Sequence, residues 1–320
     1  MMEKIRLAIV IPCYNEEEVL SETNKRIGKV IKELINDNKI SENSYVAYVD
    51  DGSKDKTWSI IEEFYQQYDY VQGIKLSRNR GHQNALLGGL MSVKDHCDAA
   101  ISIDADLQDD VEAIKAMVDE YYKGSEVVYG VRSARKTDTF FKRVTAEGFY
   151  KVMDKMGTKT VFNHADYRLM SKRVLDELAN YKEVNLFLRG IIPTIGFKTS
   201  CVYYERAERF AGESKYPLKK MLAFAFEGIT SFSTTPIRLI MNFGIFMAFM
   251  AAALCVGFSI YGIFESINWT RLFLFTSIFF IGGLQLAAIG LVGQYVGKAY
   301  IETKERPRFI IEKHLIQEEK

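Results

Sequence analysis

This 320-residue chain contains few cysteines and tryptophans, and neither sign of charge is in excess. Its four cysteines are scattered, without the spacing of a metal site or a disulfide framework, so a reducing compartment is the simplest inference. The 42 basic and 41 acidic residues leave a formal charge of +1, which gives no reason to expect nucleic acid as a partner. G-x-G-x-x-G does not follow the first predicted strand, and G-x-x-x-x-G-K-[ST] is absent. These absences argue against a dinucleotide-binding oxidoreductase and a P-loop nucleotidase.

Charged residues are also missing from two long stretches near the C-terminus. Leu239–Phe264 and Leu272–Val296 contain no Asp, Glu, Lys or Arg. Each is longer than the ~20 helical residues that cross a hydrocarbon core. We therefore predict a two-helix transmembrane hairpin over residues 238–298. Basic residues flank the pair of stretches on both sides: Lys219, Lys220, Arg238, Lys298, Lys304, Arg306 and Arg308. The positive-inside rule therefore places both ends of the pair in the cytoplasm.

Before these stretches, short apolar runs alternate with amphipathic segments. The apolar runs predict strands over residues 7–12, 45–49, 73–76, 99–103 and 126–131. The amphipathic segments predict helices over residues 17–36, 57–68, 83–94 and 111–123. We expect Pro12 to end the first strand. The alternation predicts an α/β domain over residues 1–212, a Rossmann-like, mostly parallel sheet with helices on both faces.

Acidic residues follow three of these predicted strands. They are Glu16, Asp50, Asp51, Asp104 and Asp106, and an aromatic residue, Tyr14, lies nearby. Open α/β sheets bind ligands outside the carboxyl ends of their strands. Carboxylates accept hydrogen bonds from ribose or a base, and oxygen ligands suit Mg²⁺ or Mn²⁺ held together with phosphates. As a set, these residues indicate a nucleotide site. Taken singly, each acid is equally well explained as a helix cap or a turn residue.

Three short motifs carry a resemblance to a known family. They are Val10–Glu16 (VIPCYNE), Asp50–Ser53 (DDGS) and Asp104–Gln108 (DADLQ). In order and spacing they are similar to the nucleotide-sugar signatures of family 2 glycosyltransferases, which have the GT-A fold. Four later motifs resemble the polyprenyl-phosphate branch, which includes dolichol-phosphate mannose synthase and the bacterial GtrB-type enzymes: Gly130–Arg132, Phe141–Arg143, Asp166–Met170 and Ala211–Tyr216. The likeness covers essentially the whole chain.

This resemblance implies roles for individual residues. The donor site would contain Pro12, Tyr14, Glu16, Asp51, Asp104, Ala105 and Asp106. The ligands of Mg²⁺ or Mn²⁺ would be Asp106, which also counts as catalytic, and Gln108. The acceptor's phosphate would be bound by residues among Arg132, Arg143, Arg168, Arg209, Ser214 and Lys215.

Asp166 matches the proposed catalytic base of the GtrB-type enzymes. A phosphate monoester has a second pKa of about 6, so the acceptor needs little deprotonation at neutral pH. Three alternatives therefore stay open: Asp166 orients a basic residue such as Arg168, it orders the acceptor loop, or it pairs with Arg168 structurally. No partner for His82 or His164 is apparent, so neither is assigned a role.

The remaining segments have simpler expectations. Residues 213–237 contain an apolar surface beside a basic side, which predicts an amphipathic helix in the membrane interface, with a packed helix of the soluble domain as the alternative. Residues 299–320 are expected to form a cytoplasmic tail. The second apolar stretch has a face of small residues, which suggests packing into a homo-oligomer such as a tetramer. This face consists of Gly282, Gly283, Gly290, Gly293 and Gly297.

Together these features imply a metal-dependent, inverting glycosyltransferase of the cell membrane. It would move one sugar from a nucleotide-diphosphate sugar, UDP-glucose or UDP-N-acetylglucosamine, to undecaprenyl or another polyprenyl phosphate at the cytoplasmic leaflet. One alternative is a processive polysaccharide synthase, but the Q-x-x-R-W motif of those enzymes is absent from this sequence. A second is a non-catalytic membrane partner that binds nucleotide sugars, against which the intact set of acids argues.

Overall fold

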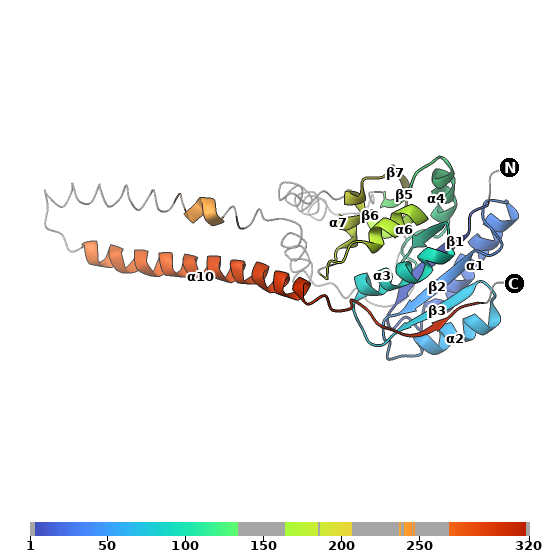
Figure 1. Ribbon diagram of the computed structural model, residues 1–320, viewed down its shortest axis with the longest axis horizontal. Helices are drawn as coiled ribbons and strands as arrows, with labels where there is room; N and C mark the ends of the chain where they lie inside the picture. Colours follow the sequence, from blue (N-terminus) through green and yellow to red (C-terminus); the bar gives the residue numbers. More distant parts are fainter. Residues whose placement is uncertain are drawn as a thin grey trace. The chain divides into compact units, whose positions relative to one another are not determined.

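The computed structural model describes residues 4–133, 164–184, 186–206, 237, 240–244, 246 and 269–317 (Figure 1). The chain forms two compact units. The first unit consists of Met1–Lys151, Lys159–Tyr216 and Arg306–Lys320, and the second of Val152–Thr158 and Pro217–Glu305.

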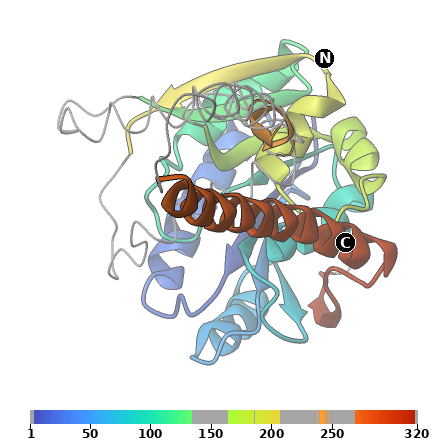
Figure 2. The ribbon, with the colours of Figure 1, turned by 90° about the vertical axis from the view of Figure 1, so that its left-hand side faces the viewer.

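An eight-stranded sheet forms the centre of the first unit, in the order β7-β5-β6-β4-β1-β2-β3-β8. Its strands are β1 (Leu7–Cys13), β2 (Tyr45–Asp50), β3 (Val71–Leu76), β4 (Ala99–Ser102), β5 (Val127–Arg132), β6 (His164–Ser171), β7 (Thr199–Tyr204) and β8 (Ile311–Leu315). β6 and β8 run antiparallel to their neighbours, and the other strands all point in one direction. Figure 2 shows β7, in yellow, at one edge. The predicted mostly parallel α/β sheet is confirmed.

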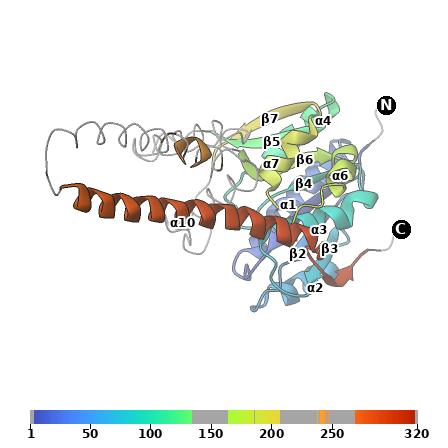
Figure 3. The same ribbon diagram turned by 60° about the vertical axis from the view of Figure 1, so that its left-hand side comes forward.

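Helices cover both faces of this sheet. They are α1 (Leu20–Asn36), α2 (Thr57–Gln67), α3 (His82–Val93), the 3₁₀ helix η1 (Lys94–His96), α4 (Ala113–Tyr122), α6 (Lys172–Ala179) and α7 (Leu188–Ile195). On one face, apolar residues of α1, α2 and α4 form a core with Leu7 and Ile9 of β1. On the other face, α3 packs so closely that a Cβ on Gly89 would lie 2.5 Å from Val10 of β1. α6 lies beside α3 and α7 (Figure 3). Since both faces are covered, β1 is buried along its whole length.

The strands differ from the sequence prediction in two respects. Pro12 does not end β1, which continues to Cys13 with Pro12 opposite Val49 of β2. The fixed φ of proline is compatible with extended backbone, so the strand can pass through it. β6, β7 and β8 were not predicted. β8 lies within the predicted tail of residues 299–320, and it pairs with β3 as part of the first unit.

The described part of the second unit is dominated by one helix, α10 (Trp269–Thr303). It contains the entire predicted span Leu272–Val296. Within α10, Phe280–Thr303 is long and apolar enough to cross a membrane, and its most apolar window is not buried. Most of the other predicted span, Leu239–Phe264, and nearly all of the predicted interfacial segment 213–237 lie outside the described residues.

Candidate functional site

The strand order gathers polar residues at a single edge of the sheet, the one formed by the carboxyl ends of its parallel strands. β1, β2, β4, β5 and β7 all end at this edge, because they point in the same direction. β6 runs antiparallel to β4 and therefore begins there, with Ser102 of β4 opposite Arg168. The Ser102 hydroxyl donates a hydrogen bond to the backbone oxygen of Asp166 at 2.6 Å. Asp166 thus lies beside the end of β4, from which the Asp104–Gln108 loop departs.

The loops that follow β1 and β2 are joined to each other by hydrogen bonds. The backbone N–H of Asn15 donates to the Ser53 hydroxyl at 3.0 Å, and that of Glu16 donates to the Thr57 hydroxyl at 2.9 Å. Tyr14 remains 41% exposed between them. The VIPCYNE and DDGS motifs, separate in the sequence, are therefore held next to each other, and Tyr14 of the first motif is exposed.

Asp51 connects these two loops to the loop that precedes α3. One carboxylate oxygen accepts the backbone N–H of Arg80 at 2.6 Å, and the other accepts that of Gly81 at 2.9 Å. Burial raises the pKa of Asp51, and these two N–H groups offset part of the rise. Gly52 has a φ of 67°, and a Cβ there would lie 2.6 Å from the backbone nitrogen of Asn79. Glycine is therefore required both by the conformation and by the close approach of the two loops.

The Asp104–Gln108 loop bends through a left-handed residue. Leu107 has a φ of 56°, which is uncommon for a residue with a branched side chain. The bend lets Asp106 accept a hydrogen bond from the backbone N–H of Gln108 at 3.1 Å. The side-chain oxygen of Gln108 also accepts a hydrogen bond from Arg206. Asp104 and Asp106 are both partly exposed, so their carboxylates can meet a ligand.

The chemistry of this loop fits a divalent cation. Burial raises the pKa of Asp104, His82 lowers it, and the carboxylates of Asp109 and Asp166 add to the rise; a cation nearby would favour the ionised carboxylate. Among the described residues, no three His, Cys, Asp or Glu side chains are grouped closely enough to hold a metal by themselves. Mg²⁺ is commonly bound by one or two carboxylates together with substrate phosphates. The oxygens of Asp106 and Gln108 are of the right kind for such a shared site.

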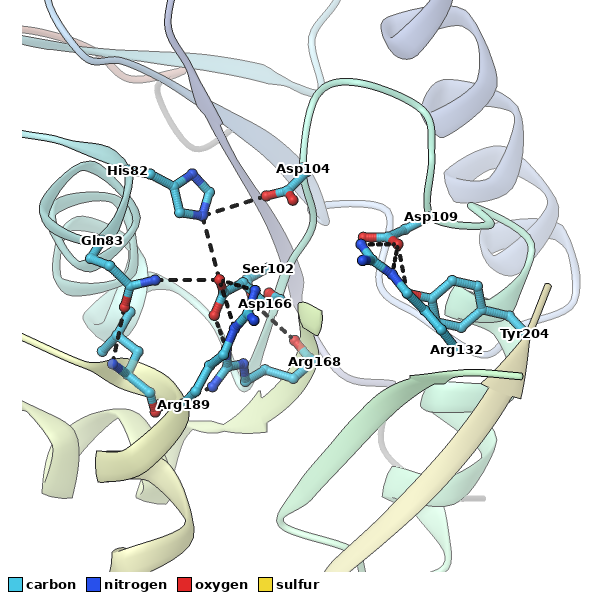
Figure 4. A network of polar contacts seen from close by, with 11 residues as sticks. His82, Gln83, Ser102, Asp104, Asp109, Arg132, Asp166, Arg168, Arg189 and Tyr204 are labelled. Carbon is cyan, nitrogen blue, oxygen red and sulfur yellow. Dashed lines mark hydrogen bonds and ion pairs between the residues drawn. The ribbon is translucent and has the colours of Figure 1, made fainter. Parts of the chain in front are cut away.

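Asp166 lies at the centre of a buried polar network (Figure 4). It is 4% exposed and pairs with Arg168, which is completely buried. Arg189 of α7 donates to the Asp166 carboxylate from two nitrogens, at 2.9 and 3.2 Å, and Gln83 donates to it at 3.3 Å. Burial alone would raise the pKa of Asp166, but Arg189 and Arg168 outweigh it and hold the pKa well below its usual range. The carboxylate is therefore ionised at any physiological pH.

His82 lies between this network and the Asp104–Gln108 loop, as Figure 4 shows. Its Nε2 atom is 3.5 Å from an oxygen of Asp104 and 3.7 Å from an oxygen of Asp166. Gln83, the next residue, accepts the backbone N–H of Leu188 at 3.0 Å. The first turn of α3 thereby connects the loop after β4 to the first turn of α7.

A second network surrounds Arg132 at the end of β5. Its Nε and Nη2 atoms donate to one oxygen of Asp109, at 3.0 and 2.8 Å. The Tyr204 hydroxyl donates to the same oxygen at 2.6 Å. Asp109 and Tyr204 are buried, whereas Arg132 is partly exposed. This network comes from three separate elements: the loop after β4, the end of β5 and the end of β7.

Most of the predicted site residues within the described chain lie at this edge. They are Tyr14, Glu16, Asp51, Asp104, Asp106, Gln108, Arg132 and Asp166. Three others are buried: Pro12 within β1, Ala105 within its loop, and Arg168, which faces Asp166 and not solvent. Arg143, Arg209, Ser214 and Lys215 lie outside the described residues.

The sequence prediction did not assign six residues that the structure brings into these networks: His82, Gln83, Ser102, Asp109, Arg189 and Tyr204. Two of them left a signal in the sequence. Asp109 directly follows the predicted metal ligand Gln108, and Arg189 is the only charged residue between Leu186 and Phe197. Tyr204 could not be found in this way, because nothing near it in the sequence indicates its partners.

Residues 8–179 match the model of glycosyl transferase family 2, and the chain belongs to this family. The protein is therefore a glycosyltransferase, as its motifs predicted. It is 51% identical to an uncharacterized glycosyltransferase of Bacillus subtilis, YkoT, over 98% of this chain and 93% of that relative. It is 40% identical to the bactoprenol glucosyl transferase of Shigella phage SfII, over 97% of this chain and 98% of the relative. A crystal structure of glucosyl-3-phosphoglycerate synthase from Mycobacterium tuberculosis is 16% identical, covers 71% of this chain and 78% of its own, and has a TM-score of 0.46.

Proposed function

We propose that this protein transfers one sugar from a nucleotide-diphosphate sugar to a polyprenyl phosphate, with inversion, and that the donor is UDP-glucose or UDP-N-acetylglucosamine. The observation that carries the proposal is the 40% identity to a bactoprenol glucosyl transferase, which extends over 97% of this chain. That likeness includes α10, which is long and apolar enough to cross the membrane in which a lipid substrate would lie.

On the donor side, Tyr14, Glu16 and Asp51 would bind the base and the ribose. Asp104 and Asp106 would face the diphosphate. Mg²⁺ or Mn²⁺, held by Asp106 and Gln108, would neutralise charge on the departing diphosphate. The support for this arrangement is the hydrogen bonding that joins the loops after β1 and β2, together with the burial and the neighbouring carboxylates that raise the pKa of Asp104.

On the acceptor side, an oxygen of the lipid phosphate would form a bond to the anomeric carbon while the bond to the diphosphate breaks. With a second pKa of about 6, this phosphate is largely dianionic at neutral pH and needs no base. A general base works best with a pKa near the operating pH, and Asp166 is held far below it. Asp166 would therefore position Arg189 and Arg168 and take no proton. Arg132 would bind the acceptor phosphate through its guanidinium fork, as would Arg143.

The membrane arrangement is part of the proposal. Residues 238–298 would form a transmembrane hairpin of the cell membrane, with the catalytic domain and both termini in the cytoplasm, where nucleotide sugars are available. Residues 213–237 would lie in the interface as an amphipathic helix. The glycines of α10 would pack against another copy of the chain in a homo-oligomer such as a tetramer. Crosslinking in native membranes tests the last point, and recovery of monomers alone would contradict it.

A donor screen tests the reaction. Purified full-length protein, undecaprenyl phosphate and Mg²⁺ or Mn²⁺ are incubated with each labelled nucleotide sugar, and the lipid is extracted. We expect one sugar in the lipid phase, with transfer lost in EDTA and in Asp106→Asn. Asp110→Asn is the matched control, because Asp110 is exposed and, within the described part of the chain, its carboxylate accepts the N–H of Glu112. A ladder of longer products would indicate a processive synthase. Folded protein that transfers nothing would indicate a non-catalytic binding partner.

A further inference from the structure

The network around Arg132 contains a buried carboxylate that the proposed mechanism does not use. Asp109 is 2% exposed, and one of its oxygens accepts three N–H or O–H groups, two from Arg132 and one from Tyr204. Burying an ionised group is costly unless it is paired and hydrogen-bonded. Asp109 meets this condition only when Arg132 lies against it. The position of the guanidinium is therefore coupled to the burial of Asp109.

The contact with Asp109 determines which way Arg132 presents its donors. Nε and Nη2 lie along one edge of the planar guanidinium, and both donate to Asp109. The adjacent edge carries Nη1 and the second N–H of Nη2, which do not take part in these two bonds to Asp109. This pair of nitrogens is the fork that binds two oxygens of a phosphate or carboxylate. The Arg132 side chain is partly exposed.

Tyr204 holds this arrangement from the other side. Its hydroxyl donates to Asp109 at 2.6 Å and accepts the N–H of Arg132 at 3.3 Å. Its ring packs edge-on against Tyr167, with 5.4 Å between the ring centroids. The hydroxyl is therefore placed by packing and not only by its hydrogen bonds. A guanidinium that is already held loses less conformational freedom when a ligand binds.

Asp109 also belongs to the loop that carries the proposed donor ligands. It lies three residues after Asp106, just beyond the left-handed bend at Leu107. The residue that contacts Arg132 thus belongs to the same loop as the residues that would meet the diphosphate.

We propose that Asp109 and Tyr204 are positioning residues, which aim the guanidinium of Arg132 at the phosphate of the lipid acceptor. This inference rests on the proposed function. It adds two residues to the acceptor site, neither of which would touch the substrate. Their effect should appear in acceptor binding and not in donor binding.

The first test compares Tyr204→Phe with Tyr203→Phe. Both variants lose one hydroxyl from β7, but Tyr203 is 71% exposed whereas Tyr204 is buried. We expect Tyr204→Phe to raise the KM for polyprenyl phosphate about ten-fold, equivalent to about 1.4 kcal/mol, with an unchanged KM for the nucleotide sugar. Tyr203→Phe should match the wild type in both. An unchanged acceptor KM in Tyr204→Phe, or an equal rise in the donor KM, would overturn the proposal.

A double-mutant cycle tests whether Tyr204 acts through Arg132. Arg132→Lys keeps the charge but loses the fork, so we expect it to raise the acceptor KM by itself. Adding Tyr204→Phe to Arg132→Lys should then change the KM by less than about two-fold, because the group that Tyr204 positions is already gone. Additive effects of the two substitutions would show that Tyr204 acts elsewhere, and would overturn the proposal.

Calorimetric titration with farnesyl phosphate separates this inference from the proposed function, since binding requires no turnover. Wild-type protein that neither transfers sugar nor binds the isoprenyl phosphate would refute the proposed function, and this inference with it. Protein that transfers sugar, but whose Tyr204→Phe variant binds farnesyl phosphate as tightly as the wild type, would refute only the positioning role. Asp109→Asn should weaken this binding more than Tyr204→Phe, because it removes the charge that holds the guanidinium.

Discussion

Replacing Asp166 by Asn should destabilise the protein severely. The substitution preserves size but removes the charge of a carboxylate that is 4% exposed. Arg168, which pairs with it, is completely buried and would lose its counter-ion. Removing one partner of a buried ion pair costs about 3–5 kcal/mol, because the remaining charge is left uncompensated. Arg189, which also pairs with Asp166, is partly exposed, so the loss of its counter-ion should reduce the stability less.

Thermal unfolding of the purified protein measures this effect. For a domain of about 150–250 residues, each kcal/mol shifts the Tm by about 2–4 °C, so Asp166→Asn should lower it by roughly 6–20 °C. Asp110→Asn, the exposed control, should leave the Tm within about 2 °C, since exposed substitutions rarely exceed ~0.5 kcal/mol. A Tm for Asp166→Asn equal to that of the control would refute the view that Arg168 depends on this carboxylate.

The pH dependence supplies an independent check. The pKa of Asp166 is lowered in the folded protein, so its contribution is fully present above the unfolded value of about 3.9 and is lost as the pH falls through the folded value. The difference in stability between wild type and Asp166→Asn should therefore stay constant from pH 8 to pH 5 and shrink only below about pH 4. A difference that disappears near pH 6 would mean that Asp166 titrates there, as a general base would.

Three further predictions concern the scaffold. Gly52→Ala should lower the free energy of unfolding by at least about 1 kcal/mol, because the left-handed φ of 67° and the 2.6 Å approach to the neighbouring loop both exclude a side chain. It should also weaken binding of the proposed donor's nucleotide in calorimetry, and unchanged binding would contradict the proposed place of the donor beside this turn. Truncation after residue 306 removes β8 and uncovers the edge of β3, so it should lower the Tm and promote aggregation, and a soluble truncate of wild-type Tm would refute this. In a Cys255→Ser background at pH 8, maleimide should label the exposed Cys201 and spare Cys97, since burial raises the pKa of the Cys97 thiol to about 12. Mass spectrometry of the labelled peptides shows which cysteine has reacted.

The sequence predicted the three strands that carry the acidic loops of the candidate site, because their signals are local. β1, β2 and β4 are apolar runs buried on both faces, and their motifs follow directly in the sequence. β6 was missed for a physical reason. Its charged residues Asp166 and Arg168 interrupt the apolar pattern, and their mutual pairing, with the further bonds from Arg189 and Gln83 to Asp166, makes both acceptable inside the sheet. β8 was missed because the short polar segment Ile311–Leu315 becomes a strand only when it pairs with β3.

By itself, the sequence determined the family, the α/β alternation, the acid-bearing loops and the apolar helix, because each depends on residues that are close together in the chain. The tertiary structure alone decided which distant side chains meet. The antiparallel direction of β6 brings Asp166 beside the loop that starts at Asp104, and the position of β7 brings Tyr204 to Asp109 across 95 residues. Strand order and direction decide such contacts, and no local periodicity encodes them.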